Sequence, residues 1–413
     1  MILSILLRRM IRVGTLEVID ANGKRHVFSG DPGPEVTIRL HSRALHHKLY
    51  LNPGLSVGEA YMDGTLTIEE GTLSDFVEVA ARNLRHLPAD PLFAARERLS
   101  RLLRRWQQYN PAGRARSNVT HHYDLPDRLY DLFLDGERKY SCAYIQNPDD
   151  DLETTQRNKQ RHLAAKLLLE PGQRVLDIGS GWGGLALHLA GAGGGEVTGI
   201  TLSEEQLKVS RQRAAKAGLA DWAHFHLRDY RAETGTYDRI VSVGMFEHVG
   251  VNHYDEYFST ISNLLADDGV CVVHSIGRMD GPGTTSTWLR KYIFPGGYSP
   301  ALSEVLEAVE RSGLWVTDIE ILRLHYAETL RHWQMRFQAN RAEIADLLDE
   351  RFCRMWEFYL AFSEAAFRYS NHMVFQLQLA KRRDTVPLTR DYIAEWERRD
   401  AHEQLLDAPG LAA

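Results

Sequence analysis

The chain contains 413 residues, of which 44% are hydrophobic and 25% are charged, and its formal net charge is −6. This composition is that of an ordinary globular protein, and its acidic balance makes nucleic acid a poor partner. No apolar run approaches the ~18 residues that a membrane span needs. The first nine residues place their charges after the apolar run, unlike a signal peptide. Three cysteines lie far apart without a CxxC pair, which predicts neither a disulfide framework nor a metal site and fits the cytoplasm.

Residues 1–95 predict a small α+β domain. The segments 15–19 and 25–28 flank Asn22-Gly23, a strong hairpin signal because both turn positions accept a positive φ. Residues 35–40 alternate polar and apolar side chains, as a half-buried strand does, and 73–84 has helical apolar spacing. We therefore expect residues 13–70 to be rich in β-strand and a helix to follow.

Residues 96–116 carry seven arginines and one glutamate, so their charge differs in sign from that of the whole chain. At helical spacing Leu99, Leu102, Leu103 and Trp106 share one face. A basic amphipathic helix with a tryptophan suits an anionic bilayer surface. The alternative is a solvated helix packed on its own domain. We expect a basic amphipathic linker helix over 96–120, and the two interpretations of its role stay open.

The remainder of the chain, 121–404, predicts an α/β domain. Five apolar segments alternate with helical ones, namely 175–178, 196–200, 223–227, 238–243 and 270–274. This order predicts a doubly wound parallel sheet whose ligand lies at the carboxyl ends of the strands, where the strand order reverses. We further expect a glycine-rich lid over 278–299, a helix over 300–313, a strand pair around 314–326 and long helices over 330–404.

The first of these strands runs into a glycine-rich loop. Gly179, Gly181, Gly183 and Gly184 allow the backbone to turn tightly and to approach a ligand closely. A glycine loop alone is a weak dinucleotide signal, and no Gly-Lys-Ser/Thr phosphate-binding pattern accompanies it. The pattern therefore favours a small nucleoside ligand such as S-adenosylmethionine (SAM) over a pyrophosphate.

Several short motifs in order along the chain carry a resemblance to a known family. They are His122-Tyr-Asp124, Tyr140-Ser-Cys-Ala-Tyr144, Val175-Leu-Asp-Ile-Gly179, Gly181-Trp-Gly-Gly184, Thr201-Leu-Ser-x-x-Gln206, Asp238 to Gly250 and Tyr292-Ile-Phe-Pro-Gly296. From about residue 50 to 385 the chain resembles the cyclopropane-fatty-acyl-phospholipid synthases and their mycolic acid relatives. The resemblance implies a Rossmann-like SAM-dependent methyltransferase that acts on the cis double bond of an unsaturated phospholipid acyl chain. It also implies an N-terminal domain that binds lipid, peripheral contact with the bilayer surface at the inner face of the membrane, and a homodimer.

The resemblance places the SAM site at the glycine loop and its neighbours. It implies that Tyr140 and Ser141 contact the methionine end, and that the glycine loop admits the nucleoside and the carboxylate. Thr201, Leu202 and Gln206 would contact the ribose. Leu202 as plain core and Thr201 as a helix start are the structural alternatives. The other residues of the expected cofactor site are Asp177, Gly179, Gly181, Gly183, Tyr230 and Arg231, the last two bordering the adenine.

Methyl transfer to an alkene leaves a carbocation, and closing a ring then requires the removal of a proton before water adds. The resemblance implies a bicarbonate ion as the base, in a site formed by Cys142, Glu247, His274, Tyr326 and the backbone of Ile276. His and Tyr can donate hydrogen bonds to an anion, and Glu247 can accept the bicarbonate O–H or orient the imidazole.

Each of these residues also has a structural alternative: His274 as a core histidine, Glu247 as a helix cap and Cys142 as packing. Phe294 and Tyr298 either stabilise the cation through their ring faces or pack the lid. Two other functions stay open as well. One is a relative that forms methyl-branched, methylene or hydroxylated fatty acids, and the other is a lipid-binding protein with an inactive methyltransferase fold.

Overall fold

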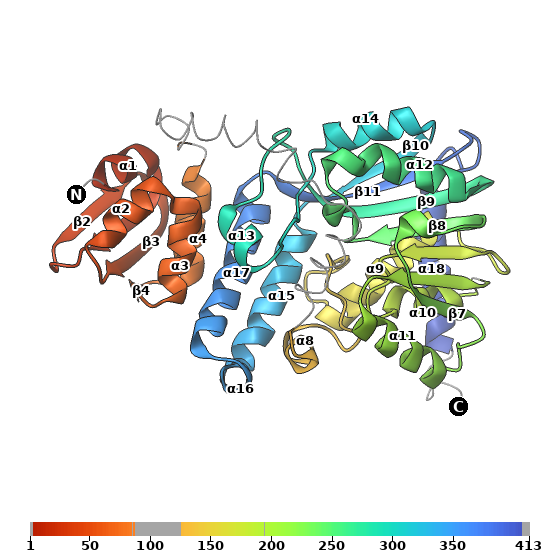
Figure 1. Ribbon diagram of the computed structural model, residues 1–413, viewed down its shortest axis with the longest axis horizontal. Helices are drawn as coiled ribbons and strands as arrows, with labels where there is room; N and C mark the ends of the chain where they lie inside the picture. The colour runs from red at the N-terminus through yellow and green to blue at the C-terminus, as the bar shows by residue number, and fades with distance from the viewer. Residues whose placement is uncertain (1–2, 85, 87–124, 194, 407–413) are drawn as a thin grey trace.

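The computed structural model describes residues 3–84, 86, 125–193 and 195–406, with side chains described up to residue 399. A small domain forms one end of the molecule, a large sheet with its helices forms the other, and two long helices lie between them (Figure 1). The predicted basic segment 96–116, the linker 96–120 and the His122 motif lie outside the described residues. Among the described helices, none is long and apolar enough to cross a membrane.

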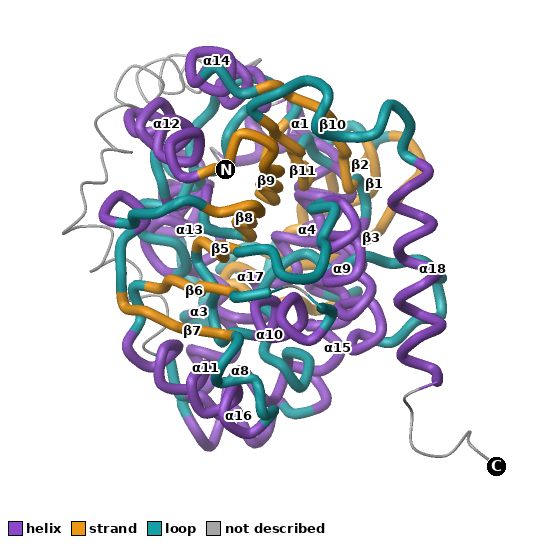
Figure 2. The backbone as a smooth tube through the Cα atoms, turned by 90° about the vertical axis from the view of Figure 1, so that its right-hand side faces the viewer, coloured by secondary structure: helices purple, strands orange, loops and turns teal. Residues whose placement is uncertain are grey.

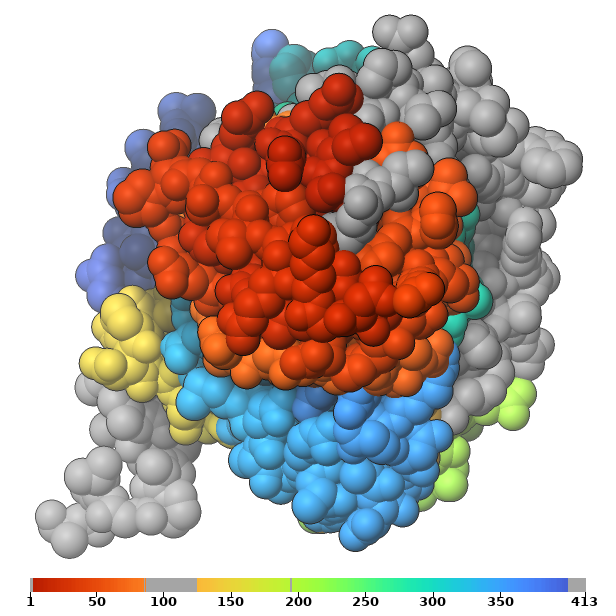
Figure 3. All heavy atoms as spheres, turned by 90° about the vertical axis from the view of Figure 1, so that its left-hand side faces the viewer, coloured from red at the N-terminus to blue at the C-terminus, as the bar shows by residue number. Residues whose placement is uncertain are grey.

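The small domain consists of a four-stranded sheet and four helices, seen from its outer side in Figure 3. The strand order is β2-β1-β3-β4, with β1 antiparallel to β2 and parallel to β3. Its elements are α1 (Leu3–Met10), β1 (Val13–Ile19), β2 (Arg25–Ser29), β3 (Asp31–Leu40), α2 (Ala44–Leu51), α3 (Pro53–Met62), β4 (Leu66–Glu70) and α4 (Leu73–Asn83).

The predicted hairpin of this domain is confirmed. Gly23 takes a φ of 80°, and its N–H donates to Asp20 O at 2.8 Å, which closes the turn between β1 and β2. The predicted helix begins after Thr72, whose hydroxyl accepts from the Asp75 N–H while the Asp75 carboxylate accepts from the Thr72 N–H. The expectation of a β-rich segment up to residue 70 is wrong over 44–62, where α2 and α3 form. These helices supply the apolar face that the small sheet needs for its core.

The large sheet has seven strands in the order β10-β11-β9-β8-β5-β6-β7. All five predicted strands are present and parallel: β5 (Val175–Ile178), β6 (Val197–Thr201), β7 (Ala223–Leu227), β8 (Tyr237–Val243) and β9 (Leu265–Arg278). Since β5 pairs with both β6 and β8, the order reverses on the two sides of β5, and the doubly wound α/β fold is confirmed.

Both faces of this sheet are covered by helices, as Figure 2 shows for α12 on one side and α9 and α18 on the other. Alternate residues of β5 and of β8 enter two separate cores. Leu176 and Ile240 pack in one core, while Val175 and Val241 pack in the other. The helices are α9 (Leu152–Lys166), α10 (Gly184–Gly191), α11 (Glu204–Lys216), α12 (Tyr254–Leu264), α14 (Leu302–Ser312) and α18 (Asp391–Leu406), with the short α8 (Asp127–Phe133) before them.

The C-terminal part differs from the expectation of long helices over 330–404 and a strand pair around 314–326. The structure has β10 (Trp315–Leu322), α15 (His325–Ala339), α16 (Arg341–Leu347) and α17 (Glu350–Tyr369), followed by the strand β11 (His372–Ala380). β11 inserts between β9 and β10 and is antiparallel to both. It is buried on both faces, so its apolar pattern cannot be distinguished from that of a buried helix by periodicity.

The lid expected over 278–299 contains the helix α13 (Thr287–Tyr292), which packs against α3 of the small domain. Trp288 is 1% exposed, and Lys291 and Tyr292 both bind Glu59 through their side chains. A Cβ atom at Gly58 would lie 2.4 Å from the Trp288 Nε1 atom. The absence of a side chain at Gly58 therefore allows the indole to approach α3.

We expect Gly58→Ala to destabilise the protein by about 1–3 kcal/mol, because the added methyl group overpacks the contact with Trp288. Gly54→Ala is the matched control on the same helix, since a Cβ there meets nothing within 4 Å. The control should be neutral or stabilising by up to about 1 kcal/mol. Urea unfolding of the two variants measures the difference, and equal stabilities would contradict the close packing.

Candidate active site

A cavity of about 190 Å³ lies at the carboxyl ends of β5, β6, β7 and β8, where the doubly wound fold places a ligand. We call it the glycine-loop cleft. Ten residues of the expected cofactor site line it: Tyr140, Ser141, Asp177, Gly179, Gly181, Thr201, Leu202, Gln206, Tyr230 and Arg231.

Gly183 does not line this cleft, so its expected contact with the cofactor is not supported by the geometry. It forms the N-cap of α10 with a φ of 83°. A Cβ atom there would lie 2.9 Å from Ser210 Cβ and 3.0 Å from the Phe225 ring. Gly183 is therefore needed for the turn and for packing against α11 and β7.

The glycine loop folds back over β6. The N–H groups of Gly179 and Ser180 donate to Ile200 O at 2.9 and 3.0 Å. Gly179 and Gly181 take φ values of 84° and 54°, which side chains rarely allow. A Cβ atom at Gly179 would also lie 2.9 Å from Met245 Cβ. Glycine at position 179 thus allows the loop to lie close to Met245, and the backbone of Gly179 lines the cleft.

Asp177 lies in β5 directly before this loop and is 1% exposed. Burial raises the pKa of its carboxyl group to about 7. Its Oδ2 atom is buried and has no hydrogen-bond partner among the described residues. A ligand that brings a cationic or N–H donor would satisfy this oxygen, and the amino group of SAM is such a donor.

The ends of β6 and β7 complete the cleft. The Thr201 hydroxyl donates to Gln206 Oε1 at 2.8 Å, whereas Ser203 is the residue that caps α11. The alternative in which Thr201 begins the helix is therefore wrong. Asp229 holds the Arg231 guanidinium through two hydrogen bonds of 2.7 and 2.8 Å, and it also lines the cleft.

Lys159 is a cleft residue that the sequence did not indicate. It lies in α9, is 2% exposed and lines the glycine-loop cleft. Its Nζ atom donates to Ser141 Oγ at 2.8 Å, and Gln156 of the same helix donates to Ser141 O at 3.0 Å. Burial lowers the pKa of Lys159 to about 7. A lysine within a charged helix resembles a solvated residue, so no sequence signal marked it.

A second cavity of about 340 Å³ adjoins the cleft, and we call it the inner cavity. All five residues expected around the anion line it: Cys142, Glu247, His274, Ile276 and Tyr326. Four residues line both the inner cavity and the cleft: Tyr140, Ser141, Gly244 and His248. The structure thus brings the two sets of expected site residues together from β9, α15 and the loops after α8 and β8.

Glu247 is half-buried in the wall of the inner cavity, and desolvation raises the pKa of its carboxyl group to about 7. Its Oε1 atom accepts from the Ile276 N–H at 2.7 Å, while Oε2 has no partner among the described residues. Ile276 N was expected to donate to an anion. In the structure this donor is already engaged by Glu247, because the loop after β8 runs directly beside the end of β9.

His274 and Cys142 are both neutral groups here. Burial holds the pKa of His274 well below its usual range, and its Nδ1 atom pairs with Gln376 Nε2 at 3.2 Å. With the Gln376 amide as donor, the imidazole keeps its proton on Nε2. Burial raises the pKa of the Cys142 thiol to about 12, which excludes a thiolate nucleophile at neutral pH.

Aromatic rings line the remainder of the inner cavity. Tyr326 packs against Phe367 with ring centroids 4.8 Å apart, and the Tyr140 hydroxyl donates to the Tyr359 hydroxyl at 2.8 Å. Phe294 and Tyr298 of the lid also line it. The Tyr298 hydroxyl donates to Glu304 at 2.7 Å, so its ring is fixed whether it packs the lid or faces a cation.

Residues 111–377 match the model of a family described as mycolic acid cyclopropane synthetase, and residues 3–88 match a domain family of unknown function. The chain belongs to the mycolic acid cyclopropane synthetase family. Among its relatives is the cyclopropane-fatty-acyl-phospholipid synthase of Escherichia coli K12, 35% identical over 83% of this chain and 87% of its own. The tuberculostearic acid methyltransferase UfaA1 of Mycobacterium tuberculosis is 35% identical over 91% of this chain and 90% of its own.

Solved structures agree with this assignment. The cyclopropane synthase MmaA2 of Mycobacterium tuberculosis superposes with a TM-score of 0.62 and 30% identity, over 66% of this chain and 99% of its own. Mycolic acid cyclopropane synthase CmaA1, complexed with S-adenosylhomocysteine, superposes with a TM-score of 0.61 and 32% identity, again over 66% of this chain and 99% of its own. The protein is a SAM-dependent methyltransferase, as the resemblance implied.

We expect the stability of the protein to depend on pH through Lys159. Its folded pKa of about 7 lies below the ~10.4 of an unfolded lysine, so the unfolded state binds more protons between these values. Stability is therefore gained as the pH rises from about 7 to about 10. Lys159→Met should be more stable than wild type at pH 6, and this advantage should shrink toward pH 10.

Urea unfolding across this pH range measures the effect, with Lys208→Met as the control because the Lys208 side chain is 63% exposed. An advantage of Lys159→Met that stays constant with pH would contradict a buried, neutralised lysine.

Proposed function

We propose that this protein transfers a methylene group from SAM to the cis double bond of unsaturated phospholipid acyl chains and so forms a cyclopropane ring. The observation that carries the proposal is the junction of the glycine-loop cleft and the inner cavity, which share Tyr140, Ser141, Gly244 and His248. A cofactor in the cleft and a lipid chain in the inner cavity would meet there. The name of the Escherichia coli relative supports a phospholipid as the substrate.

The walls of the inner cavity suit this chemistry. SAM supplies an electrophilic methyl group when it is bound. Leu289, Phe294, Leu330 and Phe367 line the space with apolar side chains and exclude water, which would otherwise add to a cation. They also hold an apolar chain near Tyr140, where the alignment of weakly reactive partners matters most.

Bicarbonate fits the polar end of the cavity as the base that removes the proton. Its O–H needs an acceptor, and the unpartnered Oε2 atom of Glu247 offers one. Its oxygens need donors, and His274 Nε2 and the Tyr326 hydroxyl are such groups in the cavity lining. Lys159, when protonated, lies close enough to lower the pKa of His274.

Mass spectrometry of phospholipids incubated with the protein and SAM tests the proposal. We expect unsaturated chains to gain one CH2 and to lose their double bond, while the total of rings and double bonds stays unchanged. A gain of CH2 together with two hydrogens, after reduction, would instead indicate a methyl-branched product. No change in mass would indicate a lipid-binding protein without this activity.

The second candidate function is the formation of a branched fatty acid. It is favoured by the relative named tuberculostearic acid methyltransferase, which spans nearly the whole chain. Both functions need the same cleft. The convergence of Glu247, His274 and Tyr326 on one cavity supports the cyclopropane product, since ring closure needs a positioned base.

We expect Glu247→Gln to reduce product formation by about 10²- to 10⁴-fold, the usual contribution of general acid–base groups, while SAM still binds. The substitution keeps the volume and one acceptor oxygen for Ile276 N–H but loses the carboxylate. Product yield and calorimetric SAM binding are measured together, with the exposed Glu205→Gln as control. Near-normal yield in Glu247→Gln would remove this carboxylate from the mechanism.

We also propose that the protein works at the inner membrane surface as a homodimer, a view supported by the family resemblance and by the basic segment 96–116. Neutralising Arg101, Arg104 and Arg105 should weaken binding to anionic vesicles, since each cation near such a surface adds about 1 kcal/mol. Vesicle sedimentation measures this, with neutral vesicles as control. Unchanged vesicle binding would favour the alternative in which the segment packs on its own domain. The proposed homodimer is tested separately by analytical ultracentrifugation.

A further inference from the structure

A third cavity of about 460 Å³ lies between the small domain, the lid and α17, and its volume is within the ~300–1,000 Å³ range of sites for small ligands. We call it the N-terminal cavity. Every lining residue that residues 3–84 contribute is apolar or glycine. They include Leu3, Leu6, Leu7 and Met10 of α1, Ile11 after it, Leu16 of β1, and Val57, Phe76, Val79 and Ala80 of α3 and α4. Protein cores rarely contain spaces much larger than a water molecule, so a space of this size and polarity suits a hydrocarbon.

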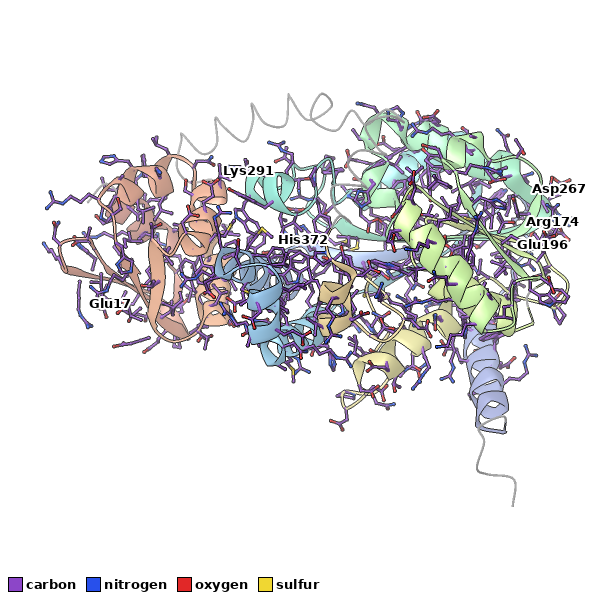
Figure 4. All side chains as sticks on the ribbon, turned by 60° about the horizontal axis from the view of Figure 1, so that its bottom comes forward. Glu17, Arg174, Glu196, Asp267, Lys291 and His372 are labelled. Atoms are coloured by element: carbon purple, nitrogen blue, oxygen red, sulfur yellow. The ribbon has the colours of Figure 1, made fainter. Side chains whose placement is uncertain are left out.

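This cavity continues into the active site. Six residues line both it and the inner cavity: Thr284, Thr285, Ser286, Phe362, Ala366 and His372. His372 begins β11 opposite Arg278, and it lies at the junction of the two parts of the molecule, far from Arg174 and Glu196 at the amino ends of the strands (Figure 4). The carboxyl edge of the sheet, which carries the active site, therefore faces the small domain.

We propose that the N-terminal cavity holds the methyl end of the acyl chain whose double bond reacts in the inner cavity. This inference rests on the proposed function. The reacting double bond lies within the chain, so hydrocarbon must extend beyond it. Phe362 and Ala366 of α17 face both spaces, and a chain passing them stays in apolar surroundings.

The distribution of polar residues in the lining indicates which end of the lipid chain enters the N-terminal cavity. Its polar residues come from the lid, the end of α17 and β11, namely Thr284, Thr285, Ser286, Thr287, Arg290, Ser370 and His372. The part built by α1, α3 and α4 offers no described side chain that could bind an ester or a headgroup. The methyl terminus is the end of a phospholipid chain that needs no such partner.

Photo-crosslinking of the full-length protein tests this placement. A phospholipid with a diazirine at the methyl end of its unsaturated chain should label peptides within 3–84. The same group on the second, saturated chain should label them much less. Label confined to residues 125–399 would overturn the proposal. Stronger labelling of residues 3–84 by the probe on the saturated acyl chain than by the probe on the unsaturated one would also overturn it. Because labelling needs no turnover, it can succeed even if mass spectrometry shows no CH2 transfer, which would count against the proposed function alone.

A cavity-filling variant gives a second test. Ala80→Phe places a ring in the N-terminal cavity, while Val27→Phe adds the same ring at a position on β2 that is 61% exposed. Ala80→Phe should lower turnover of long methyl-side chains by about tenfold for every two methylene groups that it excludes. For lipid chains that are truncated just beyond the double bond, the turnover by Ala80→Phe should equal that by Val27→Phe. Equal turnover of long chains by both variants would overturn the proposal.

Discussion

The active site depends on two carboxyl groups that the fold desolvates and that no cation among the described residues neutralises. Asp177 and Glu247 each keep one oxygen without a partner among the described residues, and burial brings both pKa values to about 7. Burying such groups is costly unless hydrogen-bond donors reach them. The same low polarity strengthens any hydrogen bond that a ligand supplies. The cavities are therefore arranged to favour ligands that bring donors to these two positions, one in the cleft and one beside it.

Strand register places the second of these carboxyl groups. Val243 of β8 is paired with His274 of β9, and His274 is paired with Gln376 of β11. The loop after β8 therefore runs beside Ile276, whose N–H fixes Glu247, while Gln376 fixes the imidazole. Glu247 is thus held by backbone and His274 by a neighbouring strand, so the geometry of these two side chains exists before a ligand arrives.

The parallel strands and the glycine loop could be predicted because each leaves a local pattern, whereas the two sets of site residues follow from the resemblance to a known family. Apolar runs followed by glycine or by polar residues at strand ends identify the carboxyl edge of a sheet. β11 could not be predicted in this way, since its partners lie about one hundred and about sixty residues earlier in the chain and its buried Gln376 and Gln378 interrupt the apolar pattern. Lys159 could not be predicted as a cleft residue for a similar reason, because its place in the cleft depends on burial and not on its neighbours in sequence.

The lid joins the small domain to the base site through the chain itself. At one end Trp288 is buried against Gly58, and at the other the Tyr298 N–H donates to Glu247 O at 3.0 Å. Burying ~150–250 Å² of a tryptophan at ~25 cal/mol per Å² corresponds to about 4–6 kcal/mol, whereas the exposed Lys291–Glu59 pair adds little. The indole is thus the main anchor of the lid. Since Trp288 and Tyr298 belong to the same lid, the position of α3 and the position of the Glu247 backbone are linked through this one segment.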